Sequence, residues 1–122
     1  MRVLISWSSG SVTARLDDTP TARKLMDVLP YEGSANTWGD EVYFRLPFAA
    51  ERDATASTLV AKGAVCFWLE GSSLALLFGP TPVSKGEECR LISEANVLGM
   101  IEGDATVLKS VNSGDRIRLE AS

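Results

Sequence analysis

Apolar and polar residues alternate along the first sixteen positions of the chain. The apolar positions lie on one side of an extended backbone, before and after the turn Ser8-Ser9-Gly10; they are Val3, Ile5, Trp7, Val12, Ala14 and Leu16. Successive side chains of a β-strand point to opposite faces, so this pattern predicts a β-hairpin with one buried face.

The period then changes to that of a helix. Apolar residues recur at positions i, i+3, i+4 and i+7 from Ala22 to Leu29, which is the stripe of a helix that packs on a core. Thr19 is a suitable N-cap, and Pro20 fits the first helical position, where no N–H is needed. Pro30 is expected to end the helix.

Strand character returns several times after this helix. The predicted strands are 31–38 at an edge, 41–46, 64–69, 74–78, 96–101 and a last one around 117–119. Both 64–69 and 74–78 are so apolar that we expect both of their faces to be covered. Gly99 inside a strand suggests a bulge or a close backbone approach. Asp104 is expected to cap a second short helix.

The segment 41–46 alternates in a way that bears on function. Its inward positions are Val42, Phe44 and Leu46, and its outward positions are Glu41, Tyr43 and Arg45. The segments 47–62 and 83–95 show no clear period. Within the first, 49–59 is weakly helical or loop-like, and we expect the second to be a rigid loop that follows the two prolines of Gly79-Pro80-Thr81-Pro82.

These elements predict a mainly β fold in a single domain, 1–122. About eight short strands and two short helices are expected, with mostly antiparallel pairing. Closing the strands into a barrel would bury the apolar alternation and also remove exposed sheet edges. The sequence therefore predicts a closed eight-stranded β-barrel.

The composition excludes several classes of partner and of catalytic site. Twelve basic and sixteen acidic residues give a net charge of −4, which argues against nucleic acid as a partner. The chain has no histidine, so Ser-His and Cys-His nucleophile pairs and histidine zinc sites are excluded. No cofactor or metal motif is present. The longest apolar run is too short for a membrane span, and the first residues are unlike a secretory signal. We expect a cytoplasmic protein with Cys66 and Cys89 as free thiols.

The order of elements resembles the cyclophilin-like fold, and more closely a family of short prokaryotic cyclophilin-like proteins of unassigned function. The residues that carry the resemblance are Thr19-Pro20-Thr21-Ala22, 38–44 (Trp-Gly-Asp-Glu-Val-Tyr-Phe), 63–68 (Gly-Ala-Val-Cys-Phe-Trp), Phe78-Gly79-Pro80-Thr81-Pro82 and Asn96-Val97-Leu98-Gly99. The resemblance implies an eight-stranded barrel flanked by two helices.

Cyclophilins isomerise X-Pro bonds with an arginine beside an apolar pocket. The segment Phe44-Arg45-Leu46-Pro47-Phe48 resembles the strand that presents this arginine. The pocket histidine and the Met-x-Gly-Gly segment of those enzymes have no counterpart here, so the full catalytic set is absent. A weak peptidyl-prolyl isomerase is one alternative that the resemblance leaves open.

The leading hypothesis is a binding module without catalysis. Arg45 could recognise a carbonyl, carboxylate or phosphate through two hydrogen bonds. The other candidate ligand-binding residues are Trp38, Tyr43, Phe48, Pro80, Thr81 and Pro82. The expected partner is a peptide or a small anionic ligand, and a homo-oligomer is a third possibility. Each candidate also has a structural interpretation: a solvated arginine, packed aromatic rings and a rigid corner that ends a central strand.

Overall fold

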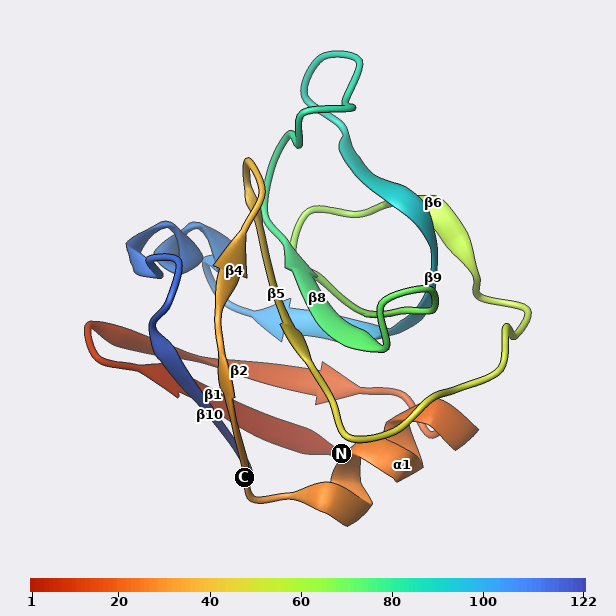
Figure 1. Ribbon diagram of the computed structural model, residues 1–122, viewed down its shortest axis with the longest axis vertical. Helices are drawn as coiled ribbons and strands as arrows, with labels where there is room; N and C mark the ends of the chain where they lie inside the picture. The colour runs from red at the N-terminus through yellow and green to blue at the C-terminus, as the bar shows by residue number, and fades with distance from the viewer.

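Ten strands, one α-helix and one 3₁₀ helix make up the computed structural model, which describes residues 1–122 (Figure 1). The strands are β1 (Arg2–Trp7), β2 (Gly10–Leu16), β3 (Tyr31–Ser34), β4 (Asn36–Thr37), β5 (Glu41–Arg45), β6 (Ser57–Val60), β7 (Ala64–Trp68), β8 (Ser73–Leu77), β9 (Cys89–Glu102) and β10 (Arg116–Ala121). The helices are α1 (Pro20–Val28) and η1 (Ala105–Ser110). No helix is long and apolar enough to cross a membrane.

All strand pairs are antiparallel, but the predicted closed eight-stranded barrel is wrong. The ten strands form one sheet in the order β3-β10-β1-β2-β9-β7-β8-β5-β4, and β6 pairs with β9 outside this path. The end strands β3 and β4 are consecutive parts of one extended segment joined by Ala35. The Ala35 N–H donates to the Asp115 carbonyl at 2.8 Å, whereas Asn36 already pairs with Tyr43. The two end strands, β3 and β4, are not hydrogen-bonded to each other, so the sheet curls round without closing its ladder.

The other differences from the predicted strands are one divided strand and two additions in segments without a clear period. The expected edge strand 31–38 divides at Ala35 into β3 and β4. Strand β6 forms inside 47–62, and β9 begins at Cys89 rather than at Asn96. These two additions depend on each other, because the start of β9 is the segment with which β6 pairs.

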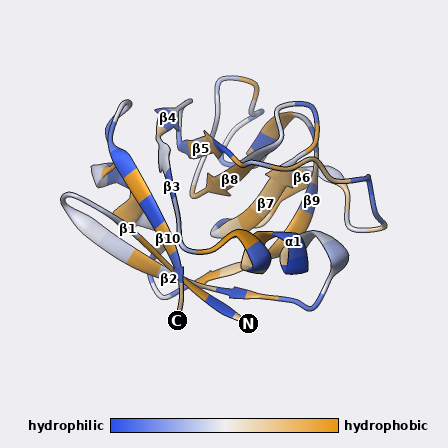
Figure 2. Ribbon diagram, turned by 60° about the horizontal axis from the view of Figure 1, so that its bottom comes forward, coloured by the Kyte–Doolittle hydropathy of each residue, from blue (hydrophilic) through white to orange (hydrophobic).

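The main core lies on the inner face of the curled sheet. The predicted hairpin β1–β2 is present, and Val42, Phe44 and Leu46 of β5 are all buried as expected. Helix α1 covers one side, with Thr19 as its N-cap and Pro20 at its first turn. Asp104 caps η1 through its bond from the Thr106 N–H. Hydrophobic colouring runs along β7 and β8 in Figure 2, in agreement with their burial.

A second, smaller core covers the outer face of β7 and β8. Its members come from these two strands and from the first half of β9; they are Ala64, Cys66, Ala75, Leu77, Cys89, Leu91 and Ala95. Figure 1 shows β9 as a long curved strand whose first half lies beside β6 and whose second half runs beside β2. The prediction that both faces of 64–69 and 74–78 are covered is therefore confirmed. Both cysteines are free and buried.

Gly99 allows β9 to pass between β2 and β7. A Cβ atom at this position would lie 1.9 Å from the Arg15 carbonyl oxygen, so only glycine fits. The register against β7 also shifts between Val65 and Cys66. Both features suggested by the sequence, a bulge and a close backbone approach, are present.

The segment before β6 is ordered by one buried amide. Asn96 is fully buried; its Oδ1 accepts from the Asp53 N–H at 3.0 Å and its Nδ2 donates to the Glu51 carbonyl at 2.8 Å. These bonds satisfy backbone groups of a loop that has no ladder of its own.

Candidate functional site

A hollow of about 270 Å³ lies on the outer face of β5, beside the second core. Five of its six lining residues are apolar or aromatic, and the sixth is acidic; they are Trp38, Glu41, Tyr43, Trp68, Leu91 and Ile92. We call this hollow the aromatic pocket. Pockets of this kind, apolar with one well-placed polar group, are typical of small-molecule sites.

Strand geometry brings the pocket residues together. Glu41 and Tyr43 are two positions apart on β5 and so share its outer face. The rings of Tyr43 and Trp68 meet edge to face, with centroids 6.0 Å apart and an interplanar angle of 79°. The Trp68 Nε1 donates to the Ser93 hydroxyl at 2.7 Å, which fixes the orientation of the indole between β7 and β9.

The turn after β4 positions the third aromatic ring. The Trp38 backbone N–H donates to the Glu41 carbonyl at 3.0 Å. Gly39 follows with a φ of +60°, and a Cβ atom there would lie 2.9 Å from the Pro80 carbonyl oxygen. Glycine is therefore needed both for the turn and for its packing against the Pro80 loop.

Glu41 is the unusual group in the aromatic pocket. The residue is only 5% exposed, and its Oε1 atom is buried with no hydrogen-bond partner. No cation is paired with it, and burial raises the pKa of the carboxyl to about 7. Loss of hydration without a compensating partner favours the neutral acid over the carboxylate. The alternation correctly placed Glu41 on the outer face, but that face is covered here.

Two of the residues predicted for a site, Trp38 and Tyr43, line the aromatic pocket. Arg45 follows Tyr43 on the same face of β5 and pairs in register with Ser73. It is exposed and forms no ion pair, but it does not line the hollow. The structure thus brings the two aromatic candidates together and leaves the arginine outside.

The other predicted site residues do not line the hollow. Phe48 stacks on Phe67 of the main core, with ring centroids 5.2 Å apart. The Pro80 carbonyl accepts from the Asp40 N–H at 2.9 Å, and Pro82 is exposed. Phe48 therefore packs on the main core, and the loop that contains Pro80 packs against the turn that contains Asp40.

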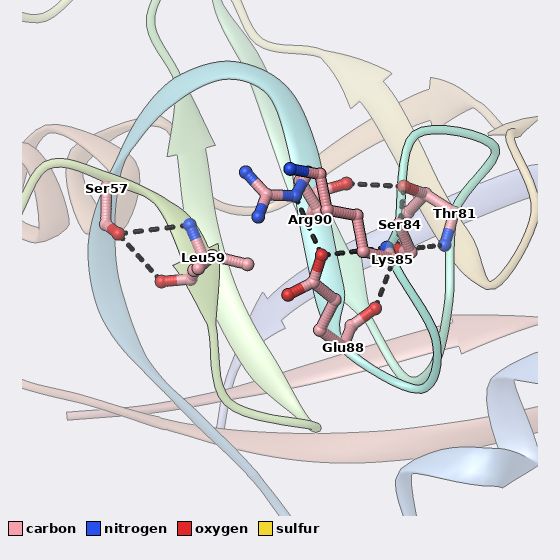
Figure 3. A network of polar contacts seen from close by, with 7 residues as sticks. All are labelled: Ser57, Leu59, Thr81, Ser84, Lys85, Glu88 and Arg90. Atoms are coloured by element: carbon pink, nitrogen blue, oxygen red, sulfur yellow. Dashed lines mark hydrogen bonds and ion pairs between the residues drawn. The ribbon is translucent and has the colours of Figure 1, made fainter.

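Thr81 belongs to a polar network that anchors the same loop (Figure 3). Its hydroxyl donates to the Arg90 carbonyl, and its N–H donates to the Ser84 hydroxyl at 2.9 Å. Ser84 in turn donates to the Glu88 carbonyl at 2.6 Å. The loop is therefore fixed to the start of β9. It also packs against the turn that carries Trp38, where the Pro80 carbonyl accepts from the Asp40 N–H.

Three pocket residues were missed by sequence reasoning: Glu41, Leu91 and Ile92. The remaining pocket residue, Trp68, is one of the three tryptophans that could stack on a ligand, among which the sequence favoured Trp38. Leu91 and Ile92 lie in 83–95, which had no readable period. Glu41 carried a signal, because it shares a face with Tyr43 beside strands predicted to be covered on both sides. The side chains of cysteine, aspartate and glutamate form no group of three or more that could hold a metal ion.

Two solved structures and one family model are similar to this chain. The solution structure of the hypothetical protein AF2241 from Archaeoglobus fulgidus matches with a TM-score of 0.85 and 34% identity, over 100% of this chain and 95% of that one. The structure of McbB in complex with tryptophan matches with a TM-score of 0.68 and 16% identity, over 98% of this chain and 44% of that one. No curated protein sequence matches the chain. The family model described as Cyclophilin-like matches residues 1–120. The chain therefore belongs to the cyclophilin-like family.

Proposed function

We propose that this domain binds a small, largely apolar ligand in the aromatic pocket. The observation that carries the proposal is a hollow with three aromatic walls and a single, unpartnered acidic group. Aromatic side chains offer large contact areas at low entropic cost. An unpaired buried carboxylate destabilises the fold, and groups with strongly shifted pKa values cluster at functional sites.

The pocket favours a different ligand from the one expected around Arg45. Its charged group is Glu41, which would repel an anion, whereas Arg45 lies outside the hollow. We therefore propose a ligand that is not anionic. An isomerase activity has less support, because the arginine that would carry it is not beside an apolar hollow. McbB, which contains the same fold, has been solved with tryptophan; at 16% identity that likeness concerns the fold, and our proposal depends on the pocket itself.

A fragment screen followed by ¹H–¹⁵N NMR tests the proposal. Small aromatic fragments should shift the amides of 38–43, 68 and 91–92 together. Ile92→Ala trims the pocket wall at a side chain that is 58% exposed, so folding should be unaffected. Because part of one apolar contact is lost, binding should weaken by about fivefold.

Val107→Ala is the matched control, since Val107 is also exposed, at 42%, and lies on η1 outside the pocket. It should leave fragment affinity unchanged. Fragment shifts that cluster away from the pocket, or equal effects of the two substitutions, would contradict the proposal.

A further inference from the structure

We propose that the ligand of the aromatic pocket is a small organic ammonium ion that retains at least one N–H group. This inference rests on the proposed function and adds the chemical class of the ligand. The observations that carry it are the unpartnered Glu41 carboxylate and the three aromatic rings around the same hollow.

The carboxylate supplies the first requirement, a hydrogen-bond donor. Glu41 Oε1 is buried without a partner, although buried polar atoms in folded proteins are nearly always hydrogen-bonded. No other lining side chain carries a charge. A donor from the ligand would satisfy this atom. A hydrogen bond between a charged donor and a carboxylate is about twice as strong as one between two neutral groups.

The aromatic rings supply the second requirement, a positive charge. The faces of tryptophan and tyrosine rings attract cations, most strongly when the cation is removed from water. Trp38, Tyr43 and Trp68 surround the hollow that Glu41 faces, so one cation could contact the rings and the carboxylate together. Quaternary ammonium ions satisfy the rings but have no N–H for Oε1, which is why the proposal requires one.

The neighbours of Glu41 leave its charge uncompensated. The titratable groups near it on the packed elements are Tyr43 on β5, Cys66 on β7, Cys89 on β9 and Asp40 in the preceding turn. The same strands carry two cations, Arg45 and Arg90; Arg45 does not line the hollow, and Arg90 is paired with Glu88. Burial raises the pKa of both thiols, so they are neutral at physiological pH. Asp40 is acidic, and no lysine or arginine contributes to the shift of the Glu41 pKa. A ligand cation would therefore be the first positive partner of this carboxylate.

The size of the hollow limits the rest of the ligand. A volume of about 270 Å³ lies just below the range of about 300–1,000 Å³ that is typical of small-molecule sites. Leu91 and Ile92 provide an apolar wall, so a short alkyl or single-ring aryl group attached to the ammonium is expected. We commit to a free small amine rather than a lysine side chain, because a compact amine can place its ammonium group and its apolar group inside the hollow together.

Three probes of similar shape separate the requirements: phenethylammonium, neutral 2-phenylethanol and N,N,N-trimethylphenethylammonium. Affinities are measured by NMR titration at pH 8.5, where Glu41 is ionised and alkylammonium ions remain protonated. Phenethylammonium should bind at least about tenfold more tightly than either of the others. Nα-acetyl-lysine methylamide, which presents the ammonium of a protein side chain, should bind more weakly than phenethylammonium.

Glu41→Gln should abolish the preference for phenethylammonium over 2-phenylethanol while the alcohol still binds. Glu120→Gln is the matched control, because this glutamate lies on β10 outside the pocket; it should retain the preference. A second measurement needs no variant: at pH 5.5, where Glu41 is neutral, the preference of the wild-type protein should shrink.

The outcomes distinguish the two proposals. Pocket shifts with equal affinity for the ammonium and the alcohol would overturn the ammonium inference and leave the proposed function intact. If no probe shifted the pocket amides, the proposed function would fail as well. Equal binding of the trimethyl probe would refute the N–H requirement, and tighter binding of the lysine probe would refute a free amine as the ligand.

Discussion

Replacing Glu41 by glutamine should remove the part of the pH dependence of the domain's unfolding free energy that comes from this buried carboxyl. Burial raises the pKa of Glu41 from its ordinary 4.5 to about 7 in the folded protein. Between pH 4.5 and about 7, Glu41 keeps its proton in the folded protein but has lost it in the unfolded chain. The resulting stabilisation is complete below pH 4.5 and is lost as the pH rises towards 7.

The size of this effect follows from the two pKa values. A gap from 4.5 to about 7, at about 1.36 kcal/mol for each pH unit, corresponds to about 3 kcal/mol of unfolding free energy. Glutamine has nearly the same shape and does not ionise. The variant should therefore match the wild-type protein near pH 4 and exceed its stability by about 3 kcal/mol at pH 8.

Urea unfolding of both proteins at several pH values between 4 and 8 measures the difference. Exposed carboxylates whose pKa is lowered by arginine partners, such as Glu32 and Glu94, titrate alike in both proteins and cancel. A free-energy difference that stays constant across this range would refute the reasoning, because Glu41 would then have an ordinary pKa in the folded state.

Three further substitutions or reactions test the fold around the site. Gly99→Ala places a Cβ atom 1.9 Å from the Arg15 carbonyl oxygen and should cost about 3 kcal/mol or more in urea unfolding; a loss below about 1 kcal/mol would be inconsistent with this packing. Asn96→Ala leaves the Asp53 N–H without its acceptor and should cost about 2 kcal/mol, with faster hydrogen exchange of that amide; unchanged exchange would count against the role assigned to Asn96. Burial raises the pKa of the Cys66 thiol to about 12, so Ellman's reagent at pH 8 should label it in the unfolded chain but only very slowly in the native protein; rapid native labelling would show that the second core opens readily.

Local sequence signals predicted most of the inner core. The alternation of Val42, Phe44 and Leu46 gave the buried face of β5 correctly, and Thr19 with Pro20 marked the start of α1. These elements were predictable because period and capping chemistry depend on residues close together in the chain.

The edges of the sheet and half of the site were not predictable in this way. Strand β6 and the start of β9 stabilise each other through long-range pairing, which leaves no local period. The division of one extended segment at Ala35 depends on which neighbour each half meets. Alternation also placed Glu41 on the outer face without indicating that it would be buried there, beside a hollow that Leu91 and Ile92 also line. The missing information was tertiary in each case.

A ¹³C NMR titration of the Glu41 side-chain carboxyl, with and without saturating phenethylammonium, tests the central claim most directly. The free protein should titrate near pH 7, and the bound protein should titrate at a lower pH because a cation stabilises the carboxylate. A carboxyl that titrates near 4.5 in the free protein, or whose midpoint does not move when phenethylammonium is bound, would contradict a buried acid that awaits a cationic ligand.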